Sequence, residues 1–190
     1  MIKIEIMQEG RELRDAFIKK FLLTWEEFQM EYCDFLENMK EKHYEFKFED
    51  ALMWDRMPRA YHEPTYAEAL AMLRELGGEI YFLAEPNGEL CFDGMIYQNY
   101  VARANAAELA RLIEYDWYEG LKAEDYFYNA ILPPDLYVFD ASMTHLIVFT
   151  HENDPWDFAF DDPHRAAEAR YCIAYGFFGE KRSCESGEPL

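Results

Sequence analysis

Imidazole and carboxylate side chains crowd one segment of the chain, between residues 145 and 164, and these residue types can do chemistry. Histidine nitrogens and carboxylate oxygens hold divalent metals, or they exchange protons with a substrate as base and acid. The cluster comprises His145, His151, Glu152, Asp154, Asp157, Asp161 and His164.

A small metal-dependent hydrolase that uses His145, His151 and Glu152 is therefore one alternative for the function. The spacing of the cluster matches no known ligand motif, because it contains neither HExxH nor an EF-hand loop. His145 and His151 would share one face of a strand only if that strand were unbroken. We favour a polar cluster at a strand end that hydrogen-bonds the neighbouring loop, and we predict no metal and no cofactor.

Nucleophilic catalysis has little support in the sequence. Ser142 is the only serine before residue 183, and the residues around it lack the Gly-x-Ser-x-Gly turn that exposes a nucleophilic hydroxyl. The four cysteines form no CxxC pair, and none has a histidine within a few residues to act as its base. The nine glycines are scattered, so no phosphate-binding loop exists. We predict no catalytic residue.

Acidic residues are concentrated in the second half of the chain. Residues 112–162 hold twelve acids and one base, Lys122, and twelve tyrosine, tryptophan and phenylalanine residues lie among them. Carboxylates attract a basic surface and speed association, while aromatic side chains supply anchors for an interface. The predicted partner-binding residues are Glu114, Asp116, Trp117, Glu119, Glu124, Asp125, Glu152, Asp154, Trp156, Asp157, Asp161 and Asp162.

The overall charge indicates which partners the protein can have. The 190 residues include 18 basic and 38 acidic side chains, a formal net charge of −20. Direct attraction to nucleic acid or to an anionic membrane is therefore not expected. The first residues do not read as a signal peptide, and charges interrupt every apolar run, so we expect a cytoplasmic protein. Acidity that serves only solubility is the simpler explanation of the same charges.

Helix signals are clear along the chain. Thr24, Thr65 and Asn105 each precede a glutamate by three residues, which is typical of helix N-termini. The pattern of apolar residues predicts helices over 11–23, 25–43, 66–76, 106–118 and 163–175. The apolar stripe of the 25–43 helix, which includes Trp25 and Phe28, predicts that this helix packs on a sheet.

Strand signals fill the intervals between the helices. Segments 79–83 and 89–92 flank a Pro-Asn-Gly turn and predict a hairpin. Segments 136–139 and 146–149 predict a second hairpin at the centre of the sheet, and 1–6 and 44–48 alternate like edge strands. Helices and hairpins alternate along the chain, which favours an α+β fold. In such a fold we expect an antiparallel sheet that is covered by helices on one side. We expect one domain over 1–178 and a polar, flexible tail over 179–190.

The leading hypothesis is an acidic, stoichiometric binding protein that blocks a basic partner, such as a nuclease or another nucleic-acid-binding protein, by imitating nucleic acid. A phage anti-defence protein, for example an anti-CRISPR, and a toxin-neutralising immunity protein both fit this description. The sequence also predicts that Cys33, Cys91 and Cys172 are buried and reduced, since their scattered spacing is typical of structural thiols.

Overall fold

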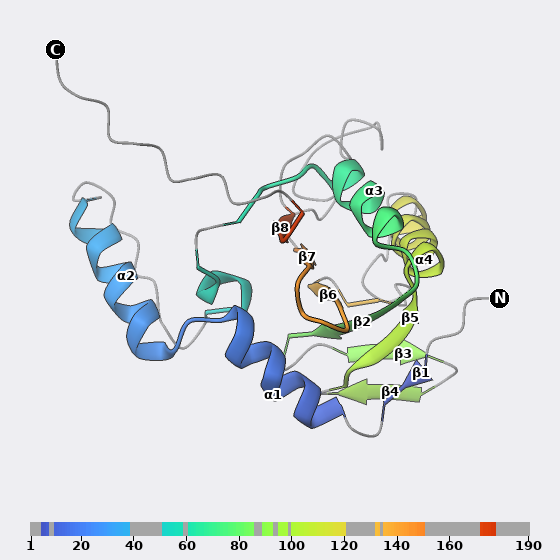
Figure 1. Ribbon diagram of the computed structural model, residues 1–190, viewed down its shortest axis with the longest axis horizontal. Coiled ribbons are helices and arrows are strands. Elements are labelled where there is room, and N and C mark those ends of the chain that lie inside the picture. Colours follow the sequence, from blue (N-terminus) through green and yellow to red (C-terminus); the bar gives the residue numbers. More distant parts are fainter. Residues whose placement is uncertain are drawn as a thin grey trace, which may run out of the picture.

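A six-stranded antiparallel sheet forms the centre of the protein in the computed structural model (Figure 1). The structure describes residues 5–7, 10–38, 51–58, 61–85, 89–92, 95–98, 100–120, 132–133, 135–150 and 172–177; of 32–38, 89–92, 98 and 117–120 it describes the backbone alone. The strands, in their order across the sheet, are β1 (Glu5–Ile6), β5 (Ala102–Asn105), β2 (Glu79–Ala84), β6 (Leu136–Asp140), β7 (Leu146–Phe149) and β8 (Ile173–Tyr175). The predicted α+β fold with an antiparallel sheet is confirmed.

Side chains alternate along the central strands between two buried layers. In β2, Ile80 and Phe82 belong to one apolar cluster, whereas Leu83 belongs to the other. In β6, Val138 and Phe139 likewise face opposite layers. Because both faces are buried, these strands read in the sequence as continuous apolar runs rather than as alternating ones.

Helices α3 (Tyr66–Leu76) and α4 (Ala106–Gly120) cover one face of the sheet (Figure 1). The predicted N-caps of both helices are confirmed. Thr65 forms a complete capping box with Glu68, and the Asn105 side chain accepts hydrogen bonds from the backbone N–H groups of Ala107 and Glu108. The caps satisfy backbone donors that the first helical turn leaves without partners.

The opposite face of the sheet is covered by α1 (Gly10–Phe21) and by residues 51–58, which include the short 3-10 helix η2 (Trp54–Arg56). Phe17 of α1 is fully buried, and its ring lies 5.1 Å from that of Phe139 and 5.7 Å from that of Tyr137. Ring contacts at these distances stabilise a core beyond the area that they bury.

Helix α2 (Trp25–Asn38) lies where the sequence predicts a helix, but the predicted packing on the sheet is wrong. Figure 1 shows α2 directed away from the sheet, and Phe28 is the one buried side chain among those described on it. The physical reason is that α1 and residues 51–58 already fill the sheet face that lies nearest to the start of α2.

The predicted hairpin of 79–83 with 89–92 is also wrong. Strand β2 pairs with β5 and β6, while β3 (Glu89–Phe92) pairs with β4 (Met95–Gln98) in a separate two-stranded sheet. Asp93 and Gly94 separate the paired residues Phe92 and Met95, and Asp-Gly is as strong a signal for a short hairpin as the Asn-Gly of the predicted turn. The second predicted hairpin, β6 with β7, is confirmed.

The C-terminal end of the predicted 163–175 helix is a strand instead. Strand β8 pairs with β7, and on its other side Ala174 exchanges two backbone hydrogen bonds with His62. Cys172 is buried, as predicted, whereas the side chains of Cys33 and Cys91 lie outside the described residues. Segments 44–48, 163–171 and 179–190 also lie outside them, and only Glu5 and Ile6 of the predicted first strand are described.

Candidate functional site

Two of the predicted partner-binding acids have side chains that the structure describes, and both lie on α4. The Glu114 carboxylate accepts a hydrogen bond from Arg74 of α3 at 2.8 Å, in a half-exposed ion pair. Asp116 is 7% exposed, and its Oδ2 accepts the backbone N–H of Leu132 at 2.9 Å. The expectation of an exposed carboxylate is therefore corrected for Asp116, because this side chain ties the end of α4 to a neighbouring segment.

The neighbour of these two acids, Tyr115, is 59% exposed. Of the other predicted residues, Trp117 and Glu119 are described only as part of the α4 backbone. The rest lie outside the described residues: Glu124, Asp125, Glu152, Asp154, Trp156, Asp157, Asp161 and Asp162.

Of the residues proposed for the hydrolase alternative, the structure describes His145 at the end of the β6–β7 turn. Its backbone N–H donates to Asp140 Oδ1 at 2.6 Å, its Nδ1 lies 3.7 Å from the same oxygen, and its ring packs against Phe177. The described part of the chain contains no group of three potential metal ligands, and His151 and Glu152 lie outside it. His145 thus takes part in holding the turn.

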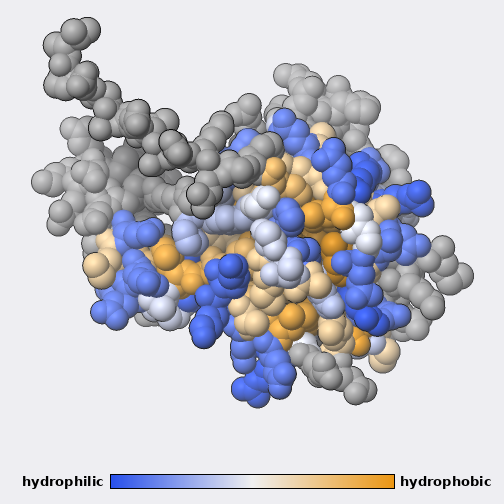
Figure 2. Space-filling model, in the orientation of Figure 1, coloured by the Kyte–Doolittle hydropathy of each residue, from blue (hydrophilic) through white to orange (hydrophobic). Residues whose placement is uncertain are grey.

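Helix α2 carries an acidic surface that the sequence interpretation missed. We define the α2 surface as the exposed residues Trp25, Glu26, Glu27, Met30 and Glu31. Trp25 is 50% exposed and Met30 is 66% exposed. In Figure 2, hydrophilic residues surround a small apolar area over α2. The signal that could have indicated this surface is charge, because residues 25–38 contain five acids and no base.

The start of α2 is held in place by contacts with η2. Arg56 stacks over the Trp25 ring, with its Cζ 4.1 Å from the ring centroid, and donates to the Leu23 carbonyl at 2.7 Å. The Thr24 backbone N–H and hydroxyl donate to the Glu27 carboxylate and hold the pKa of Glu27 below its ordinary value. The α2 surface is therefore anchored at one end, where the Glu27 carboxylate is held in its ionised form.

A buried polar network fixes residues 51–58 to the sheet. Glu85 Oε1 accepts the Met53 backbone N–H at 2.8 Å and the Tyr137 hydroxyl, and the Tyr137 oxygen accepts the Trp54 backbone N–H at 2.9 Å. Arg14 of α1 donates to the Ala84 carbonyl at 3.1 Å. Burial raises the pKa of Glu85, against the opposing effect of its hydrogen bonds, and raises that of Tyr137 well above its ordinary value. These groups hold residues 51–58 and α1 against the sheet.

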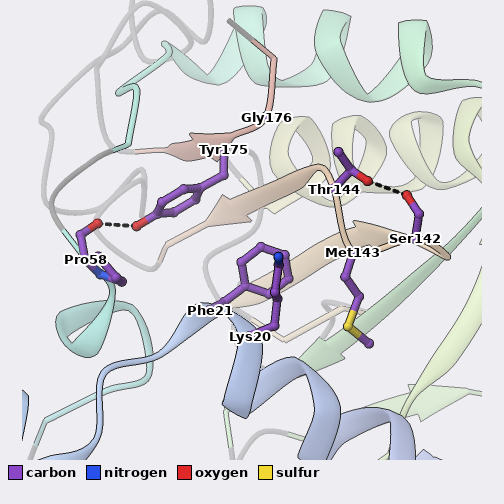
Figure 3. Close-up of a pocket in the computed structure, with 8 residues that line it drawn as sticks. All are labelled: Lys20, Phe21, Pro58, Ser142, Met143, Thr144, Tyr175 and Gly176. Atoms are coloured by element: carbon purple, nitrogen blue, oxygen red, sulfur yellow. Dashed lines mark hydrogen bonds between the residues drawn. The ribbon is translucent and has the colours of Figure 1, made fainter. Parts of the chain in front are cut away.

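A pocket of about 340 Å³ opens where the end of α1, the β6–β7 turn and β8 meet (Figure 3). Its lining residues are Lys20, Phe21, Pro58, Ser142, Met143, Thr144, Tyr175 and Gly176. Tyr175 donates its hydroxyl hydrogen to the Pro58 carbonyl, and the Ser142 and Thr144 hydroxyls share a hydrogen bond. None of these residues was predicted as part of a site, because the pocket joins four segments far apart in the sequence.

No protein-family model, curated protein or solved structure matches this chain. None of the described helices is both long enough and apolar enough to cross a lipid bilayer. A function can therefore be inferred only from the charges, exposure and contacts of the candidate surfaces.

Proposed function

We propose that this protein is an acidic, stoichiometric binding protein that covers a basic, nucleic-acid-binding surface of a partner protein. A phage anti-defence protein, such as an anti-CRISPR, or a toxin-immunity protein would act in this way. The observation that carries the proposal is the α2 surface, an acidic helix face that projects from the sheet and exposes Trp25 and Met30 (Figure 1).

The spacing of the α2 surface suits a basic partner. Residues four apart lie side by side on a helix, so Glu27 lies next to Glu31, and Glu26 lies next to Met30. Two like charges at this spacing destabilise a helix, and α2 contains no base to offset them. Lysine and arginine side chains of a partner would remove this repulsion, while Met30 and Trp25 would supply the apolar contact area.

The net charge of −20 favours a basic partner for the chain as a whole as well. It raises the local concentration of a basic protein and disfavours direct contact with nucleic acid. Apart from the buried Asp116, the acids predicted from the sequence between Glu114 and Asp162 belong to this proposal as a second part of the interface.

Affinity capture from host cell extract, followed by binding measurements with the purified captured protein, tests the proposal. We expect a basic nucleic-acid-binding protein that binds in a one-to-one ratio and that double-stranded DNA displaces. A variant of the α2 surface with Glu26→Gln, Met30→Ala and Glu31→Gln should bind about tenfold more weakly, since interface anchors typically contribute 1–2 kcal/mol or more.

A matched control variant carries Glu63→Gln, Glu75→Gln and Met95→Ala. It loses the same charge and one exposed methionine, but from other parts of the described surface. Equal binding by the two variants would exclude α2 as the interface. Capture of no basic protein, or of one that DNA does not displace, would contradict the proposed function.

A further inference from the structure

The pocket beside the β6–β7 turn has features of a ligand site, independently of the proposed function. Its volume of about 340 Å³ lies at the lower end of the range for small-molecule sites. Figure 3 shows that the lining residues come from four separate segments: the end of α1, Pro58, the β6–β7 turn and the end of β8. Sites of this kind combine apolar walls with a few polar groups.

The apolar walls are aromatic rings and a thioether. The Phe21 and Tyr175 rings lie 6.2 Å apart at 51°, and Met143 packs against the same buried cluster. The hydroxyl of Tyr175 is held by the Pro58 carbonyl, and burial raises its pKa, so this wall remains uncharged at neutral pH. An apolar group can pack against such walls.

The backbone of Met143 has an unusual conformation for its residue type. Its φ is 52°, in the left-handed region that glycine and asparagine adopt more readily, and its N–H donates to the Asp140 carbonyl at 2.9 Å to close the turn. Glycine would form this turn without strain, so the turn itself does not require methionine. Strained residues gather at functional sites, and the flexible Met143 side chain lines the pocket.

The polar groups of the pocket determine which polar group a bound molecule should carry. Ser142 donates to Asp140 Oδ2, and the Ser142 and Thr144 oxygens lie 2.5 Å apart, so Thr144 donates to Ser142. Both hydroxyl hydrogens are thus used within the turn. Lys20 is the one charged residue of the lining, and its ammonium group supplies hydrogen-bond donors. A negatively charged oxygen is the group that best matches Lys20.

We propose that this pocket binds a small apolar molecule with one carboxylate, which pairs with Lys20 while the apolar part lies between Phe21, Met143 and Tyr175. Such a molecule could be a free aromatic acid, or the C-terminal residue of a peptide that ends in an apolar side chain.

Titration of the ¹⁵N-labelled protein with 3-phenylpropionate and with its amide tests the proposal. We expect shifts of the backbone amide signals of residues 142–144 and 175–176, and about fivefold tighter binding of the carboxylate, as for a partly exposed ion pair. Lys20→Met should abolish this preference, whereas Lys19→Met, the same change on the adjacent exposed residue, should retain it. The same comparison with an acetylated tripeptide that ends in phenylalanine, and with its amide, distinguishes a peptide C-terminus from a free aromatic acid as the ligand.

Met143→Gly is the second variant. Glycine retains the turn, and the substitution removes the Met143 side chain from the lining of the pocket. Thermal unfolding should show a folded protein, and binding of 3-phenylpropionate should weaken at least fivefold. Met95→Ala, at an exposed methionine of β4, is the control and should bind as the wild type does. Absence of shifts at the lining residues up to about 5 mM ligand, where even a site with a Kd of about 1 mM is mostly occupied, would overturn the proposal. So would equal affinity for acid and amide.

Discussion

Glu85 and Tyr137 together decide how residues 51–58 attach to the sheet. Both side chains are buried, and they bind two consecutive backbone N–H groups, those of Met53 and Trp54. A buried polar group without a partner costs more free energy than a hydrogen bond contributes, so each member of this network depends on the others.

Tyr137→Phe should lower the free energy of unfolding by about 1–3 kcal/mol. The substitution keeps the ring contact with Phe17 but removes the hydroxyl that joins Glu85 to the Trp54 N–H. Urea denaturation measures the change. Tyr115→Phe, on an exposed ring of α4, is the control and should change the free energy by less than about 0.5 kcal/mol. Similar values for both variants would contradict the structural importance of the network.

The raised pKa of Glu85 predicts a pH dependence of stability. Because burial favours the protonated form, Glu85 contributes stability that is fully present below its ordinary pKa of 4.5 and is lost as the pH rises through the raised value. Glu85→Gln retains a hydrogen-bond acceptor and does not titrate. The stability of this variant relative to the wild type should therefore increase between about pH 4 and pH 7.

Urea denaturation of both proteins across this pH range measures the difference. Glu75→Gln, at an exposed site on α3, corrects for the loss of one negative charge. A difference between the Glu85 variant and the wild type that stays constant with pH would show that burial does not shift the pKa of this carboxyl group.

At the scale of elements, the approach of β8 to the β6–β7 turn depends on a glycine. A Cβ at Gly176, whose φ is 81°, would lie 2.1 Å from the Thr144 carbonyl oxygen. Gly78 has a similar φ of 62°, but no atom lies within 4 Å of the position its Cβ would take. The two glycines thus separate the cost of backbone conformation from the cost of a steric clash.

Gly78→Ala should lower the free energy of unfolding by about 1–2 kcal/mol, the cost of the left-handed conformation alone. Gly176→Ala should cost about 2 kcal/mol more, since the clash forces β8 away from the turn. Denaturation curves of the two variants test this difference. Equal losses would show that β8 and the turn can move apart freely.

At the scale of the whole molecule, two groups of acids are candidates for the interface: the three glutamates of the α2 surface and the acids of the segment 112–162. Charges farther apart than about 8 Å are largely screened at physiological salt, so each surface acts on what lies directly against it. Variants that change one surface at a time can therefore show which of them the partner contacts.

Reversal of Asp154, Asp157 and Asp161 to lysine tests the segment predicted from the sequence. If these acids face a basic partner, the association rate should fall about tenfold and depend less on salt, because charge steers diffusional encounter. Stopped-flow binding at several salt concentrations measures both effects, and circular dichroism checks the fold. An unchanged rate and salt dependence would leave the α2 surface as the site of attraction.

Local signals in the sequence were sufficient to predict several elements. Thr24, Thr65 and Asn105 cap the helices that they were expected to begin, because an N-cap involves atoms only two or three residues apart. The β6–β7 hairpin was predictable for the same reason, and the succession of helices and hairpins was sufficient for the α+β class.

Only the tertiary structure decided which segments pair and which faces are covered. The partners of β2, the strand at Ile173–Tyr175 and the exposure of α2 depend on contacts between residues far apart in the chain. Asp116 was expected at the surface because other acids lie near it in the sequence. In the structure its side chain instead accepts a hydrogen bond from the backbone N–H of Leu132. Burial and long-range pairing override local preference, since they determine how much apolar surface leaves water and which polar groups find a partner.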